Sequence, residues 1–308
     1  MSSPPPADPA PRRVALKVDC DTLVGTREGI PALLDVFARR GIRATFYFTL
    51  GPDRSGVAAR RVFTRRGFLR KMWKSRAASL YGFPTMLYGT LLPAPPIGER
   101  YAREIRSVAD AGHETGVHGW DHVGWHDGLD RWSEEKIRQH VERAHAEYRR
   151  IFGTAATSSA APGWTANVVS LDVESERGLL FTSNSRGGTP FFPRAGGRTF
   201  ATLEIPSTLP TLDETLAWDD LLDDAAQRNF YRRAPLGTEV HTIHTEVEGR
   251  SRRALFERIL DDWRSDGVSF PTLAELARET LAGPGEIPVR ELVRTALPGR
   301  GGTVATGT

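Results

Sequence analysis

The chain has 308 residues, of which 39% are hydrophobic and 26% charged, and its formal net charge is +3. These values are typical of a soluble globular protein with a sizeable core, and the single cysteine, Cys20, excludes an intrachain disulfide and indicates a reducing compartment. No run of 18 apolar residues could span a membrane, and the proline-rich first residues lack the apolar segment of a secretory signal. We therefore expect a cytoplasmic protein.

Short apolar runs alternate with amphipathic helical patterns between two expected flexible tails, residues 1–11 and the Gly- and Pro-rich residues 283–308. Strands are predicted at residues 14–18, 44–49, 113–118, 179–183, 202–205, 240–244 and 268–270, and helices at 28–40, 99–111, 133–150, 218–233, 252–265 and from 273 onward. Ser133 is a suitable N-cap, and Gly112 suits the position after a helix. The alternation predicts one α/β domain over residues 12–282, a parallel barrel with its helices outside.

Two carboxylates stand at the end of the first predicted strand. Asp19 and Asp21 are two residues apart, so an extended backbone points both side chains the same way. Carboxylates that close repel each other, and one stays protonated unless a cation lies between them. Two aspartates spaced in this way, taken alone, more often belong to a solvated turn. A metal-binding interpretation therefore needs support from elsewhere in the chain.

Such support comes from two histidines after the third predicted strand. His118 and His122 are four residues apart, which places both imidazoles on one face of a helical turn, as in paired zinc ligands. A carboxylate would complete a three-ligand open site, although histidines also cluster here at His113 and His126. This donor set suits Zn, Co, Mn or Fe.

A late strand ends at His244, which is followed by Glu246. His244 is either a buried core histidine or an acid that protonates a leaving amine, as amide hydrolysis requires. Asp19, His118 and His244 all stand at the carboxyl ends of predicted strands, where barrels of this kind build their active sites.

These segments resemble the motifs of the polysaccharide deacetylase family, carbohydrate esterases with a distorted (β/α) barrel. The matching segments are residues 18–22, 118–122 and 160–164 and the strand that ends at His244. The resemblance implies that Asp19 is the general base, that His244 is the acid, and that a divalent metal ion is held by Asp21, His118 and His122. We also expect substrate contacts from Trp164, Arg186 and Glu246.

Longer segments are similar to one bacterial subgroup of deformylases within that family. They include residues 26–34, 71–82, 118–126, 206–214 and 244–249. The resemblance implies removal of a formyl group from 4-deoxy-4-formamido-L-arabinose linked to undecaprenyl phosphate. The products would be formate and the free 4-amino sugar lipid used in lipid A modification and polymyxin resistance. Two alternatives are an N-deacetylase of another lipid-linked or polymeric amino sugar and an inactive membrane-binding relative.

The sequence departs from the family's pattern at two positions. Ala160 stands where most of the family has an arginine that steadies the base, and Arg186 could supply that charge. Asn184 stands where the subgroup has an aspartate, which would matter if that carboxylate oriented His244 or the sugar.

Residues 54–98 form an expected insertion with no Asp or Glu, but with many basic and aromatic residues. Basic amphipathic segments bind anionic membrane surfaces, so we expect membrane contact through Arg70, Lys71, Trp73 and Lys74, and a peripheral position on the inner face of the cytoplasmic membrane. The alternative is a long lid with its charges in water. Nucleic acid is disfavoured as a partner because no recognition motif accompanies the charge. The sequence does not indicate the oligomeric state.

Overall fold

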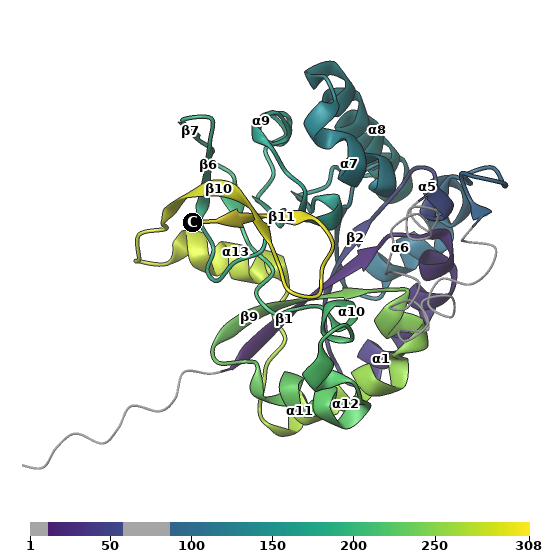
Figure 1. The fold of residues 1–308 in the computed structure, drawn as a ribbon, viewed down its shortest axis with the longest axis vertical. Coiled ribbons are helices and arrows are strands. Elements are labelled where there is room, and N and C mark those ends of the chain that lie inside the picture. Colours follow the sequence, from purple (N-terminus) through teal and green to yellow (C-terminus); the bar gives the residue numbers. More distant parts are fainter. Residues whose placement is uncertain (1–11, 58–86) are drawn as a thin grey trace, which may run out of the picture.

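A parallel sheet forms the centre of the computed structural model, which describes residues 12–57 and 87–308 (Figure 1). Within these residues the sheet has seven strands in the order β8-β5-β4-β3-β2-β1-β9, all parallel to their neighbours. The strands are β1 (Arg13–Cys20), β2 (Thr45–Phe48), β3 (Glu114–Val117), β4 (Ser158–Ser159), β5 (Phe181–Thr182), β8 (Leu203–Glu204) and β9 (Thr238–His244).

The sheet curls until its two edge strands approach each other. The segment after β8 connects them, because the backbone amides of Thr208 and Leu209 both donate to the carbonyl oxygen of Val240 in β9, at 3.0 and 3.1 Å. The seven strands form most of the barrel wall, and the irregular segment after β8 closes it. The predicted distorted (β/α) barrel is therefore confirmed.

The two faces of the strands belong to different cores because successive side chains alternate in direction. In β1, Val14, Leu16 and Val18 pack in a hydrophobic cluster with the outer helices. The intervening Ala15 belongs to a second cluster inside the barrel with residues such as Tyr47 and Phe181. Lys17 and Asp19 share the face of Ala15, so the sequence of β1 alone directs two charged groups into the barrel.

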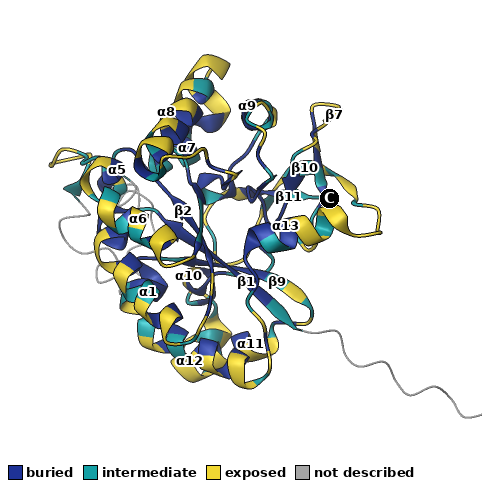
Figure 2. Cartoon of the chain, turned by 180° about the vertical axis from the view of Figure 1, so that it is seen from behind, coloured by how far each residue is buried: buried dark blue, intermediate teal, exposed yellow. Residues whose placement is uncertain are grey.

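Most helices pack on the outside of the sheet and expose their outer faces (Figure 2), whereas the buried residues of the last helix belong to the inner cluster. They are α1 (Ile30–Ala38), α5 (Ile97–Arg100), α6 (Ala102–Asp110), α7 (His122–Gly128), α8 (Glu134–Phe152), α9 (Val168–Ser175), α10 (Leu212–Thr215), α11 (Asp224–Arg233), α12 (Arg253–Ser265) and α13 (Leu273–Ala282). The expected caps are present: the Ser133 hydroxyl accepts from the amide of Lys136, and Gly112 has φ +81° beyond the end of α6.

The C-terminal residues form a hairpin, so the prediction of a flexible tail at residues 283–308 was wrong. Strand β10 (Val289–Ala296) pairs antiparallel with β11 (Thr303–Gly307) and parallel with β6 (Phe192–Ala195), which pairs with β7 (Arg198–Thr199). The Gly and Pro residues that suggested disorder lie in the connections before β10 and between the two strands. The folded domain therefore extends past residue 282. A second expectation also fails, since residues 268–270 make only a single bridge, between Ser269 and Arg13.

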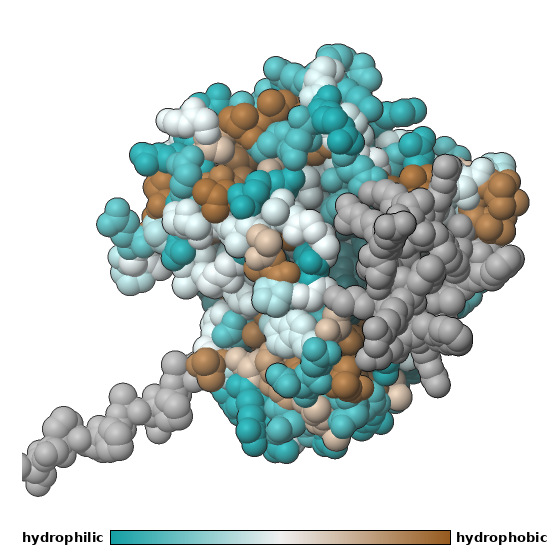
Figure 3. All heavy atoms as spheres, in the orientation of Figure 1, coloured by the Kyte–Doolittle hydropathy of each residue, from teal (hydrophilic) through white to brown (hydrophobic). Residues whose placement is uncertain are grey.

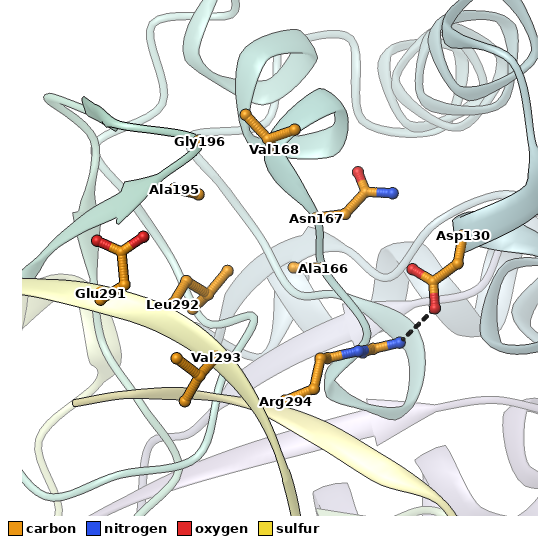
Figure 4. A pocket seen from close by; sticks show the side chains of 10 residues that line it. All are labelled: Asp130, Ala166, Asn167, Val168, Ala195, Gly196, Glu291, Leu292, Val293 and Arg294. Carbon is orange, nitrogen blue, oxygen red and sulfur yellow. Dashed lines mark hydrogen bonds and ion pairs between the residues drawn. The ribbon is translucent and has the colours of Figure 1, made fainter.

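An open pocket of about 400 Å³ lies between β10, the turn after β6 and the start of α9 (Figure 4). It is lined by Asp130, Ala166, Asn167, Val168, Ala195, Gly196, Glu291, Leu292, Val293 and Arg294. On the face shown in Figure 3, hydrophobic residues form separate patches among hydrophilic ones. No helix within residues 12–57 and 87–308 has the length and apolar character that crossing a membrane requires. The expected membrane contacts, Arg70, Lys71, Trp73 and Lys74, lie outside the described residues.

Candidate active site

Three strands bring the predicted site residues to one end of the barrel. The register pairs Asp19 of β1 with His244 of β9, so these two residues are neighbours across the sheet. His118 follows β3 directly, and His122 is the first residue of α7. The parallel strands all end at the same rim, which is why residues distant in sequence meet there.

Asp21, His118 and His122 form a candidate metal site. One ligand atom from each residue lies within 4.8 Å of the other two. The Nε2 atom of His118 is 3.3 Å from Oδ1 of Asp21, and Nε2 of His122 is 3.5 Å from Oδ2. Burial lowers the pKa of His122 to about 4, so its ring is neutral at pH 7 and offers a lone pair. This donor set matches a two-histidine, one-carboxylate site for a divalent ion.

The hydrogen bonding of His118 supports a cation at this point. Its Nδ1 atom lies 2.9 Å from the carbonyl oxygen of Ala160, which can only accept, so Nδ1 carries a proton. In the neutral ring Nε2 is then a bare lone pair facing Oδ1 of Asp21, a buried atom without a hydrogen-bond partner among the described residues. Two acceptors this close repel each other unless a proton or a metal ion lies between them. A backbone carbonyl behind the imidazole is also the usual support of a metal-binding histidine.

Asp19 is buried beside the triad, with Lys17 as its cationic neighbour. The Asp19 side chain is 4% exposed, and its Oδ2 atom is 3.8 Å from Nε2 of His118 and 3.7 Å from Nζ of Lys17. Lys17 is fully buried, donates to the carbonyl oxygen of Ser183 at 2.9 Å and lies 5.3 Å from the ring centre of Trp164. Burial lowers the pKa of Lys17, and the charge of Asp19 opposes this shift. The cation beside the expected base is thus Lys17, which the sequence analysis did not single out, and not Arg186.

Replacing Lys17 by methionine should lower kcat by more than tenfold without changing the metal content. At an effective dielectric constant of about 20, unit charges about 4 Å apart interact by roughly 4 kcal/mol, and each 1.4 kcal/mol changes a rate about tenfold. Steady-state kinetics of Lys17→Met and Lys17→Arg check this expectation. Arginine keeps the charge and should restore much of the rate; equal losses in both variants would mean that the charge is unimportant.

His244 is paired with Asp213, a second residue that the sequence analysis did not identify. Nδ1 of His244 lies 3.3 Å from Oδ1 of Asp213, which immediately follows the first residue of α10. Burial alone would lower the pKa of His244, but the charges of Asp213, Asp21 and Asp19 raise it well above its ordinary value. The Asp213 contribution does not depend on a bound metal. The Asp213 charge therefore favours the protonated form of His244, the form that can donate a proton to a leaving amine.

The Asp213→Asn variant should lose activity at a lower pH than the unmodified protein. An acid works while it is protonated, so the rate falls as the pH rises through the pKa of His244. Removing the Asp213 charge lowers that pKa, and a charge at this distance is worth about 1–3 units. The alkaline limb of the kcat/KM profile should shift to lower pH by this amount. An unshifted limb would show that Asp213 does not set the proton affinity of the acid.

The three residues expected to contact substrate are buried, and their side chains contact other protein groups. Trp164 and Glu246 are each 2% exposed and Arg186 is 6% exposed. The Arg186 guanidinium forms an ion pair with Glu214 at 2.9 Å and lies 4.8 Å from the ring centre of Trp164. Glu246 accepts from the amide and hydroxyl of Thr22, at 2.9 and 2.5 Å. These burials argue against direct substrate contact; Glu246 instead fixes the turn that follows the two aspartates.

Asn184 has a structural explanation that does not involve His244. Its side-chain amide donates to Glu174 at 2.7 Å, and its backbone amide donates to Glu204 at 2.7 Å. Burial raises the pKa of Glu174 to about 7, with Asn184 and Ser159 opposing the shift by hydrogen bonding. An aspartate at position 184 would face this buried carboxyl group, whereas asparagine donates to it.

The barrel rim thus carries an Asp-His-His group with Asp19 and His244 beside it, which is the set of groups that a metal-dependent hydrolase needs. The chain belongs to the polysaccharide deacetylase family, because the sequence model of the family described as polysaccharide deacetylase matches residues 7–181. A hydrolase acting on amide C–N bonds is the activity that this membership and the relatives support.

Two curated relatives cover nearly the whole chain. One, from Shewanella sediminis (strain HAW-EB3), is 35% identical over 94% of this chain and 93% of its own. The other, from Wigglesworthia glossinidia brevipalpis, is 31% identical over 92% of this chain and 98% of its own. Both carry the name probable 4-deoxy-4-formamido-L-arabinose-phosphoundecaprenol deformylase. A solved structure from Mycobacterium smegmatis, named as a polysaccharide deacetylase, superposes with a TM-score of 0.62 at 18% identity over 96% of this chain and 99% of its own, which supports the fold.

Proposed function

We propose that this protein is a metal-dependent deformylase that acts on 4-deoxy-4-formamido-L-arabinose linked to undecaprenyl phosphate. The observation that carries the proposal is the meeting of Asp21, His118 and His122 within 4.8 Å, beside Asp19 and opposite the His244–Asp213 pair. The substrate comes from the names of the two curated relatives. Because that sugar is carried on a lipid, the proposal places the enzyme at a membrane surface.

The mechanism divides the proton transfers between two residues on adjacent strands. Asp21, His118 and His122 would hold a divalent ion, which supplies Lewis-acid activation of water and of the formyl oxygen. Asp19 accepts a proton from the attacking water, and Lys17 stabilises its carboxylate before the transfer. His244 donates a proton to the sugar nitrogen as the C–N bond breaks, while Asp213 stabilises the imidazolium. This step yields formic acid and the free amine. Formic acid then loses its remaining proton to solvent and becomes formate, and proton exchange with solvent returns Asp19 to the carboxylate and His244 to the imidazolium.

Formate release from the lipid-linked formamido sugar tests the proposal. The metal-loaded protein should produce one formate and one amino sugar lipid for each substrate consumed. The matched N-acetyl sugar lipid serves as the comparison. Faster release of acetate than of formate would make the protein a deacetylase, and no product from either substrate, with metal bound, would overturn the assignment as an active hydrolase.

A further inference from the structure

The turn of the C-terminal hairpin carries an arginine to the edge of the active site. The turn spans residues 297–302 between β10 and β11, and lies beyond the residues that the family model matches. Gly299 has φ +80°, and a Cβ there would lie 2.6 Å from the carbonyl oxygen of Glu214 and 2.7 Å from Nε1 of Trp218. Only glycine permits so close an approach, so the turn is seated firmly on α10.

Arg300, the next residue, lies against the platform formed by Gly163 and Trp164. Its guanidinium carbon is 4.6 Å from the ring centre of Trp164, and Nη2 donates to the carbonyl oxygen of Gly163 at 3.3 Å. Gly163 also touches the helix of the metal site, since a Cβ there would come within 2.5 Å of His126 in α7. Arg300 therefore contacts Gly163, which lies against α7 of the metal site. It also contacts Glu214, the residue next to the Asp213 that pairs with His244.

The positive charge of Arg300 is not fully neutralised by its neighbours. Glu214 accepts two hydrogen bonds from Arg186, at 2.9 and 3.0 Å, and one from the amide of Thr211 at 3.0 Å. Its contact with Arg300 is longer, at 3.5 Å. Two guanidinium groups therefore share one carboxylate, and Asp213 is already paired with His244. The Arg300 side chain keeps 17% of its surface exposed, so an anion can reach it.

A second contact holds the hairpin just before this turn. Arg294 of β10 reaches across the pocket to Asp130, just beyond α7, with a separation of 3.1 Å (Figure 4). The two arms of contact, at Asp130 and at α10, fix the turn relative to the site. A planar guanidinium stacked on an aromatic ring and held in a rigid turn is suited to bidentate recognition of a phosphate group.

We propose that Arg300 binds the phosphate that joins sugar to lipid in the substrate, so that the C-terminal hairpin selects phosphate-linked sugars. This inference rests on the proposed function for the identity of the phosphate. The sugar must place its formamido group at the metal triad, and its phosphate then lies farther out, on the rim where Arg300 stands. Arg186 cannot serve in this way because it is buried and bound to Glu214.

Two substrates separate phosphate recognition from catalysis: a short-chain phosphate-linked 4-formamido sugar and the methyl glycoside of the same sugar. Loss of a charge-assisted hydrogen bond costs roughly 10- to 100-fold in binding. Arg300→Gln should therefore raise KM by this factor for the phosphate-linked sugar and should change the turnover of the methyl glycoside much less. Arg290→Gln is the matched control, because Arg290 lies on β10 and contacts the hydroxyl of Thr189. Equal losses on both substrates, or no loss on either, would overturn the proposal.

A binding measurement keeps the inference distinct from the proposed function. Dibutyl phosphate is titrated calorimetrically into the metal-loaded protein and into both variants, after thermal unfolding has shown that they are folded. The unmodified protein and Arg290→Gln should bind the phosphodiester at least tenfold more tightly than Arg300→Gln. If no formate is released but this difference holds, the substrate assignment fails and the phosphate site stands. Equal binding by all three proteins would overturn the site even if formate is released.

Discussion

Removing the divalent metal with a chelator should abolish hydrolysis, and adding back Zn, Co, Mn or Fe should restore it. Metal activation of water and carbonyl groups is worth several kcal/mol, so the rate should fall by roughly a thousandfold or more. The bound ion also favours the folded state, because an unfolded chain does not assemble Asp21, His118 and His122. The metal-free protein should therefore unfold at a lower temperature than the loaded protein.

Variants of single histidines show which histidines are needed for metal binding and activity. His122→Ala should lose both the ion and the activity, whereas His145→Ala, a buried histidine of α8 outside the triad, should retain both. Elemental analysis of each protein before and after chelation provides the measurement. Full activity in protein shown to contain no metal would contradict the mechanism.

Asp19→Asn should lower kcat by roughly 10²- to 10⁴-fold, the range expected for loss of a general base. Asparagine has nearly the same shape as aspartate but cannot accept the proton at neutral pH, so the fold and the metal content should be preserved. The fully buried Lys17 then loses its charge partner, and its backbone contact to Ser183 persists.

Asp21→Asn provides the comparison for that variant. A ligand variant should lose metal together with activity, whereas the Asp19 variant should lose activity alone. Metal content and single-turnover rates measured on the same preparations distinguish the two. Near-normal turnover by Asp19→Asn would remove this residue from the role of base.

The sequence allowed prediction of the residues that meet at the rim, because most of them stand at the ends of predicted parallel strands. Asp19 and Asp21 point the same way from the end of β1, as the two-residue spacing predicts. The helical turn expected to pair His118 with His122 is absent, because His118 follows β3, Gly119 has φ +88° and α7 begins only at His122. The parallel barrel then brings β1, β3 and β9 to a common end. The described structure thus brings together the predicted residues, although it joins the two histidines by a loop and not by a helical turn.

Lys17 and Asp213 were missed for different reasons. Lys17 is two residues before Asp19 on the same strand face, and a lysine within an apolar strand is rarely buried without a partner, so a signal was present. Asp213 lies 31 positions before His244 in sequence, in a connection whose path no periodicity specifies. Arg300 was overlooked because glycine and proline around it resemble a disordered tail, although these residues form the turn of a paired hairpin.

The central claim is that Asp21, His118 and His122 hold one divalent ion at the mouth of the barrel. An anomalous difference map from crystals grown with zinc or cobalt tests it directly. The account predicts a single strong peak bonded to all three side chains at about 2.0–2.2 Å, with Asp19 beside it. A peak elsewhere, or a fully loaded protein in which these three residues bind no ion, would contradict it.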